Sequence, residues 1–188
     1  NWSEWFQFRT ASRQRKSFSF IYFGDAQREV KSQWSRVIRQ AYKHASDARF
    51  VIHAGDLIDR HDRDAQWGEW FNAGGWLNGM LPSIPAVGNH EYGSDESGTR
   101  HLSTHWRPQF TLPMHGPEGL EETAYYVDYQ GVRIVVLNTN EQLEKQVAWL
   151  DGVLADNPQH WTVLTFHHPI FSAAVGRDNA ELRALWMP

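Results

Sequence analysis

The sequence predicts a layered α/β domain in which helices pack against a sheet. Three observations lead to this fold class: strand-like and helix-like segments alternate, the strand-like runs are short and apolar, and three of them end at a glycine. Short apolar runs of this kind are typical of strands that are buried on both faces. With 188 residues, of which 41% are hydrophobic, the chain has the size of one domain with a real core.

The elements expected from these patterns alternate along the chain. Strands are predicted, from apolar or β-branched runs, at 18–23, 49–54, 84–87, 125–129, 132–137 and 161–166. Helices are predicted, from apolar residues at helical spacing, at 28–45, 67–81 and 141–155. The stretch 92–122 is rich in Gly, Pro, Ser and His and has little periodicity, so we interpret it as a long functional loop. This order indicates helices layered against a sheet.

Composition and charge argue against several classes of function. The absence of cysteine excludes disulfides, thiolate metal sites and a cysteine nucleophile. No apolar run approaches the ~18 residues of a membrane span, so none is predicted. A net charge of −4 and a pI near 6.2 argue against a nucleic-acid partner or a nuclease, which would benefit from a basic face. An anionic substrate would need a local positive centre, which metal ions can supply.

Four polar blocks follow the ends of predicted strands. They are GDAQ at 24–27, GDLIDR at 55–60, GNHE at 88–91 and HHP at 167–169. Loops at the carboxyl ends of strands meet at one edge of an open α/β sheet, where ligands bind. Carboxylate, amide and imidazole groups together suit Mn, Fe, Zn or Mg. Two such ions about 4 Å apart can hold a phosphate and activate a water for attack.

Each block alone has an ordinary structural explanation. An Asp after a strand, such as Asp25, is often a helix N-cap, and Asn89 alone would more often be a turn residue. The two histidines at 167–168 alone would more often be loop residues satisfied by hydrogen bonds. The occurrence of four blocks in one order, each at a strand end, favours a metal site over these explanations.

The four blocks in this order resemble the signature of the calcineurin-like metallophosphoesterase family over nearly the whole chain. The resemblance implies a four-layered α/β/β/α sandwich that carries a two-metal centre. It assigns Asp25 to the first metal, Asp56 to the bridge between the metals, and Asn89 and His167 to the second metal. The implied reaction is hydrolysis of a phosphate monoester or diester of a small molecule by metal-bound hydroxide. The implied cofactors are two divalent ions, Mn, Fe or Zn, with Mg as a further option.

The resemblance also implies roles for three residues beside the metals. His90 would protonate the leaving alkoxide or donate a hydrogen bond in the transition state. Asp59 matches the family carboxylate that orients this histidine, and such a pairing fixes the imidazole tautomer. Arg60 is a candidate phosphate contact because its planar fork suits phosphate oxygens, and a surface salt bridge is an equally open explanation for it.

The sequence departs from the family pattern at three points. Gln27 stands where the family usually has a histidine ligand of the first metal, so its amide oxygen is a candidate ligand for a site that favours Mn or Mg over Zn. Asp59 stands where true purple acid phosphatases have a tyrosine, so no purple iron(III) chromophore is expected. The Gly-His-x-His motif that completes the family site does not occur before Pro188. We therefore expect a piece of a longer protein, with a sandwich that is incomplete at its C-terminal side.

The first residues indicate a link to the purple-acid-phosphatase-like branch. Residues 2–11 (WSEWFQFRTA) resemble the last strand of the fibronectin-type domain that precedes the catalytic domain in that branch. We therefore predict that 1–14 form the end of an upstream domain or a linker, and that 15–188 form a partial catalytic domain. A secreted or periplasmic location is expected on this resemblance alone, and the oligomeric state is not predicted.

A second functional hypothesis is a phosphate-binding or metal-binding relative of the same fold whose catalysis is weakened. The replacement at Gln27 supports this hypothesis. The retention of His90 and Asp59 argues against it, because a pure scaffold has no use for an acid and its orienting carboxylate.

Overall fold

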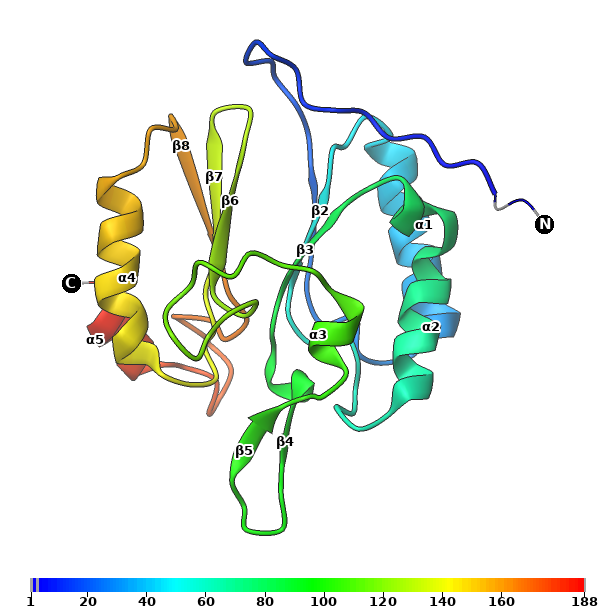
Figure 1. The fold of residues 1–188 in the computed structure, drawn as a ribbon. Coiled ribbons are helices and arrows are strands. Elements are labelled where there is room, and N and C mark those ends of the chain that lie inside the picture. Colours follow the sequence, from blue (N-terminus) through cyan, green and yellow to red (C-terminus); the bar gives the residue numbers. More distant parts are fainter. Residues whose placement is uncertain (1, 3, 188) are drawn as a thin grey trace.

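The computed structural model describes residues 2 and 4–187, which form four layers: helices, a sheet, a second sheet and helices (Figure 1). The first sheet is parallel and consists of β1 (Ile21–Phe23), β2 (Val51–Ala54) and β3 (Ser83–Ala86). Its outer face is covered by α1 (Ser35–His44) and α2 (Asp64–Gly74). The predicted fold class, a layered α/β sandwich, is confirmed.

The second sheet lies against the inner face of the first (Figure 1). It consists of β6 (Tyr125–Tyr129), β7 (Val132–Val136) and β8 (Trp161–Thr165). Strands β6 and β7 form the predicted antiparallel hairpin, and β8 runs parallel to β7. The outer face of this sheet is covered by α4 (Leu143–Ala155) and α5 (Ala180–Trp186).

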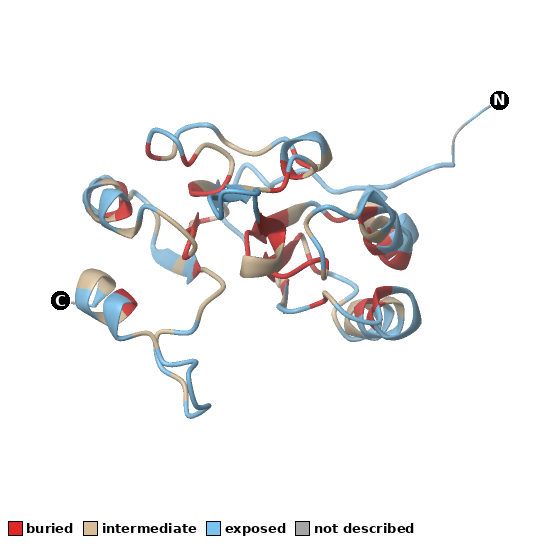
Figure 2. Ribbon diagram, turned by 90° about the horizontal axis from the view of Figure 1, so that it is seen from below, coloured by how far each residue is buried: buried red, intermediate tan, exposed pale blue. Residues whose placement is uncertain are grey.

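Three apolar clusters fill the three spaces between the layers. In β2, Val51 packs into the cluster beneath α1 and α2, and Ile52 packs into the cluster between the sheets. In β7, Ile134 lies between the sheets while Val135 packs with residues of α4. Because successive side chains of a strand point to opposite faces, a sheet covered on both sides needs apolar residues at every position. Figure 2 shows the resulting concentration of buried residues between the layers.

Several element boundaries differ from those predicted. The first strand is limited to β1, because Phe18 and Phe20 precede the strand pairing and instead pack their rings against Phe50. The predicted helix 28–45 begins with a π-helical turn, Val30–Trp34, before α1. The predicted helix 67–81 is α2 followed by a 3₁₀ turn, Gly75–Gly79.

The interpretation of 92–122 as one long loop without regular structure was incomplete. The segment contains an antiparallel hairpin of β4 (Tyr92–Ser94) and β5 (Arg100–Leu102), followed by the short helix α3 (Trp106–Gln109). The Asp95 carboxylate closes the hairpin by accepting backbone N–H groups of Ser97 and Thr99, each at 2.9 Å. Asx turns and aromatic packing fix this segment, and neither produces a periodic sequence pattern.

The described part of the N-terminal segment, residues 2 and 4–20, forms neither helix nor strand. The assignment of 1–14 to an upstream domain or linker stays a prediction, and residues 1 and 3 lie outside the described part. Across the described residues, none of the helices combines the length and the apolar character needed to cross a membrane.

Candidate metal centre

The predicted ligands meet at the carboxyl ends of the strands. Asp25 follows β1, Asp56 follows β2 and Asn89 follows β3, so the parallel register of the first sheet brings all three to one edge. His167 follows β8 and reaches the same edge from the second sheet. One ligand atom from each of Asp25, Asp56 and His167 lies within 4.8 Å of the other two.

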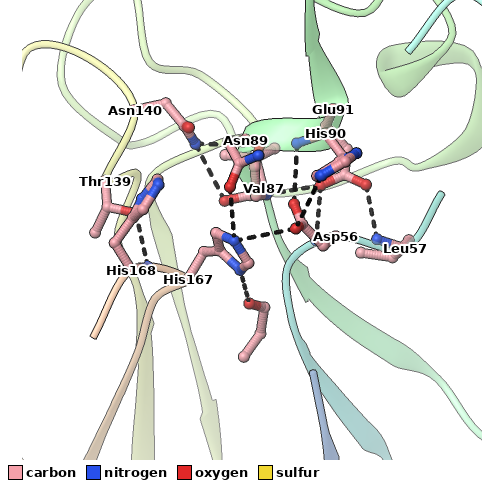
Figure 3. A network of polar contacts seen from close by, with 12 residues as sticks. Asp56, Leu57, Val87, Asn89, His90, Glu91, Thr139, Asn140, His167 and His168 are labelled. Carbon is pink, nitrogen blue, oxygen red and sulfur yellow. Dashed lines mark hydrogen bonds and ion pairs between the residues drawn. The ribbon is translucent and has the colours of Figure 1, made fainter. Parts of the chain in front are cut away.

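His167 joins the two sheets at this point (Figure 3). Its Nδ1 lies 2.9 Å from the carbonyl oxygen of Ala54, to which it donates. Its Nε2 lies 3.2 Å from Asp56 Oδ2 and 3.1 Å from Asn89 Oδ1. With Nδ1 protonated, the neutral ring has a lone pair on Nε2 that faces two oxygen acceptors. A cation, either a proton or a metal ion, satisfies all three atoms at once, so the donor set fits a divalent metal.

The charges of Asp56 and His167 stabilise each other. Burial raises the pKa of Asp56, but the hydrogen bonds from His167 and the backbone of His90, together with their charges, outweigh burial and hold that pKa below its usual value. Burial lowers the pKa of His167, but the hydrogen bond to Asp56, the charges of Asp56 and Asp25, and the bond to the Ala54 carbonyl together outweigh burial and leave the pKa raised. Each residue therefore favours the charged form of the other, as in a site built around positive charge.

The loops that follow β2, β3 and β8 lie unusually close to one another. Gly55 has a φ of 87°, and a Cβ there would lie 2.7 Å from the Gly88 nitrogen and 2.9 Å from the His167 Cβ. Asp25 and Asp56 themselves adopt left-handed φ values of 55° and 54°. Non-glycine residues in this region cluster at functional sites, and Asp tolerates it better than most. The glycine before Asp56 thus permits the close contact of the loops from the two sheets.

Glu91 is a positioning residue to which sequence reasoning assigned no role. Its side chain is completely buried, and its carboxylate accepts four backbone N–H groups. The shortest bonds come from Leu57 to Oε1 and from Gly88 to Oε2, each at 2.7 Å. Burial and the charge of Asp56 raise the pKa of Glu91 to about 7, against the N–H donors that lower it. This side chain ties the loop after β2 to the loop after β3 and so fixes Asp56 relative to Asn89.

His90 is held by a backbone group. Its Nδ1 lies 2.6 Å from the carbonyl oxygen of Asp59 and 3.7 Å from the Asp59 carboxylate. The carbonyl can only accept, so Nδ1 carries a proton and Nε2 is directed to the site, 3.8 Å from Asp56 Oδ2. The Asp59 carboxylate also pairs with Arg28 at 3.5 Å. The bond that fixes the tautomer is thus one that no side-chain motif could have revealed.

Comparison with known proteins agrees with this geometry. The sequence profile of the calcineurin-like phosphoesterases matches residues 18–187. The chain belongs to this family. No curated protein sequence matches the chain significantly. A similar solved structure is purple acid phosphatase PPD1 from seeds of yellow lupin (Lupinus luteus), with a TM-score of 0.75 at 22% identity. The match covers 96% of this chain and 37% of the lupin chain, so the described fold corresponds to part of the larger protein.

Two predicted residues of this calcineurin-like phosphoesterase lie outside the ligand group. Gln27 lines a neighbouring cavity with Arg28 and Asp59, and its Oε1 is buried without a hydrogen-bond partner. An amide oxygen in this state is free to coordinate a cation. Arg60 is exposed and pairs with Asp62 at 3.4 Å. The predicted ligand role of Gln27 and the predicted phosphate contact of Arg60 stay predictions.

The loop after β7 in this phosphoesterase supports the site from behind. Asn140 Nδ2 donates to the carbonyl oxygens of Val87 and Gly88, each at 3.3 Å. Thr139 Oγ1 lies 2.7 Å from His168 Nδ1 (Figure 3). Burial, then the neighbouring His167, lower the pKa of His168 to about 4, so its ring is neutral near pH 7. The sequence patterns singled out His168, in the HHP block, but gave no signal for Thr139 and Asn140.

Proposed function

We propose that the protein is a metal-dependent hydrolase of phosphate monoesters or diesters that uses two divalent cations. The observation that carries this proposal is the convergence of Asp25, Asp56 and His167, with Asn89 Oδ1 beside His167. Four ligand groups from four loops meet with lone pairs facing one another, an arrangement that is costly unless a cation lies among them. Family membership supports the same chemistry.

The residues divide between two cation positions. Asp25 and Gln27 would hold the first ion, Asp56 would lie between the ions, and Asn89 and His167 would hold the second. When bound, two divalent cations neutralise phosphate oxygens and lower the pKa of a water that attacks phosphorus. The ligand types suit Mn, Fe or Zn, with Mg also acceptable.

His90 would act as the proton donor. Its Nδ1–H is held by the Asp59 carbonyl, so a proton to be transferred would have to be carried by Nε2, which is directed to the site. As the phosphorus–oxygen bond of the ester breaks, Nε2–H would pass its proton to the leaving oxygen, and the ring would return to its neutral form. The backbone carbonyl of Asp59 holds the ring orientation, and the Asp59 carboxylate lies 3.7 Å from the same nitrogen.

Replacement of the bridging carboxylate tests the proposal. In full-length protein supplied with Mn²⁺, we expect hydrolysis of an aryl phosphate monoester or diester, and Asp56→Ala lowers it by on the order of 10³-fold because transition-state charge is no longer neutralised. Asp47→Ala, which removes an exposed aspartate of the loop after α1, is the control and retains the full rate. Rates are measured by release of the phenol, with bound metal quantified in parallel.

A wild-type protein that binds Mn²⁺ but turns over neither ester would overturn this proposal. That result would favour the second hypothesis, a binding relative with weakened catalysis, for which the replacement at Gln27 is the specific sequence observation. The proposed substrate is a phosphorylated small molecule; nucleic acid is not expected as a partner because the chain is acidic overall.

A further inference from the structure

We propose that Arg177 binds a second anionic group, carried by the leaving group of the substrate. This inference rests on the proposed hydrolase function and narrows its substrate class to phosphoesters whose leaving group bears a carboxylate or a second phosphate. Arg177 lies in the segment after His167–His168, outside the four motif blocks, and has no role in the sequence-based predictions.

The cleft is larger than a phosphate group requires. A cavity of about 640 Å³ contains the ligands Asp25, Asn89 and His167 in its wall, together with Arg177. Volumes in this range fit whole small-molecule ligands. A phosphate held at the ligand group fills only part of this space, so the remainder of the substrate extends along the wall that the segment 169–179 forms.

Arg177 differs from the other arginines near the site in having no partner. Arg28 is paired with Asp59 at 3.5 Å, and Arg60 with Asp62 at 3.4 Å. Within residues 2 and 4–187, the guanidinium of Arg177 makes neither a hydrogen bond nor an ion pair, and the residue is exposed to the cleft. A planar guanidinium whose five donors are free binds carboxylate or phosphate in a bidentate manner.

The backbone beneath Arg177 is braced. Arg183, on α5, donates to the carbonyl oxygen of Ile170 at 2.6 Å and forms a two-pronged pair with Asp178 at 2.7 and 2.8 Å. Asp178 also accepts the backbone N–H of Ser172 at 3.3 Å. These bonds hold both sides of the loop, so the position of Arg177 is set before a ligand binds, which lowers the entropic cost of the contact.

The test compares two esters that differ by one charge. In full-length protein with Mn²⁺, kcat/KM is measured for 4-carboxyphenyl phosphate and for phenyl phosphate. We expect Arg177→Ala to lower the ratio of these two values by roughly tenfold, the loss typical of one charge-assisted contact, and Arg177→Lys to lower it less. The intrinsic reactivities of the two phenols cancel when the ratio is compared between variants. Arg36→Ala, which removes an exposed arginine of α1, is the control and leaves the ratio unchanged.

An unchanged ratio in Arg177→Ala would overturn the inference. If both esters then lose the same factor in kcat/KM, Arg177 contacts the transferred phosphoryl group instead. Failure of the hydrolase proposal is recognised separately, because the wild type would then cleave neither these two monoesters nor an aryl phosphate diester. In that case the affinities of phenylphosphonate and 4-carboxyphenylphosphonate, which have no cleavable ester bond, decide by calorimetry. The carboxylated compound must bind more tightly to the wild type, and Arg177→Ala must remove that preference; otherwise the inference is wrong.

Discussion

The two sides of the cleft differ in whether the contacts that hold them are buried or exposed. On the side of the first sheet, the loops after β2 and β3 are fastened by Glu91, which is fully buried and accepts four backbone N–H groups. On the side of the second sheet, the segment 169–179 is exposed at most positions and is fastened by the pair of Arg183 with Asp178, whose side chains are 26% and 46% exposed. Under the proposed function, the first side would hold the cations and the second side would face the variable part of the substrate.

The bonds of Glu91 and the pair of Arg183 with Asp178 should also differ in how much they contribute to stability. A buried carboxylate with all of its acceptor positions used is expensive to disturb, because each orphaned N–H group loses its partner in a place that water cannot reach. A surface ion pair is worth only about 0–1 kcal/mol, because water replaces it readily. Disruption of the contacts on the first side should therefore destabilise the whole fold. Disruption of the contacts on the second side should open only the segment 169–179.

Glu91→Gln gives the largest expected effect. The amide nitrogen of glutamine would place a donor against N–H groups that now point at a carboxylate oxygen, such as those of Asp56 and Gly88 or that of Leu57. We expect the free energy of unfolding to fall by about 3 kcal/mol, the scale for breaking a buried charged network. Release of the repulsion between Glu91 and Asp56 keeps the loss at the lower end of that scale.

Urea denaturation of Glu91→Gln and the wild type measures this loss. Glu118→Gln makes the same chemical change at an exposed position and should alter stability by less than about 0.5 kcal/mol. Equal stability of the two variants would show that the carboxylate does not brace the first side.

His53→Phe tests whether water is excluded from the apolar layer between the first sheet and the helices α1 and α2. His53 lies in β2 among the rings of Phe23, Trp34 and Trp70, and burial lowers its pKa to about 3 from 6.5. Below pH 6.5 the unfolded chain binds a proton that the folded chain refuses until about pH 3, so stability falls as the pH decreases through this window. Between pH 7.5 and pH 5 the loss from this residue is about 2 kcal/mol, and His53→Phe removes it.

The measurement is the unfolding free energy at both pH values, and only its change with pH is compared between proteins. His44→Phe, at the exposed end of α1, should keep the pH dependence of the wild type. If His53→Phe and the wild type lose the same stability on acidification, the ring of His53 is protonated within the fold and the layer is wetter than its burial indicates.

The sequence predicted the first side of the cleft better than the second for a physical reason. Asp25, Asp56 and Asn89 each follow a glycine at the end of an apolar run, and parallel pairing then brings such residues together without further information. The family profile and the four layers confirm the predicted family and fold class. Strand ends were predictable because burial on both faces leaves a strong apolar signal.

The remaining parts depend on contacts that leave no local pattern. The carbonyl of Asp59 that orients His90 is a backbone group, so no residue type announces it. The hairpin within 92–122 is closed by an Asx turn, and Arg177 acquires its place only through a brace from a helix beyond it. Tertiary contacts of this kind set the geometry of the site but produce no periodic sequence pattern. Periodicity is the signal on which sequence interpretation relies.

Arg183→Gln gives the smallest expected change in stability and the sharpest contrast with Glu91→Gln. Loss of a partly exposed pair should lower the free energy of unfolding by at most about 1 kcal/mol and leave Mn²⁺ affinity unchanged. The segment 169–179 would lose the bonds that Arg183 makes to Ile170 and Asp178 and would then be cut faster by a protease under native conditions. Limited proteolysis and metal titration, with Arg36→Ala as control, measure both quantities. A weaker affinity for Mn²⁺ in Arg183→Gln would show that the two sides of the cleft are not independent, because the brace on the exposed side would then also hold His167 in place.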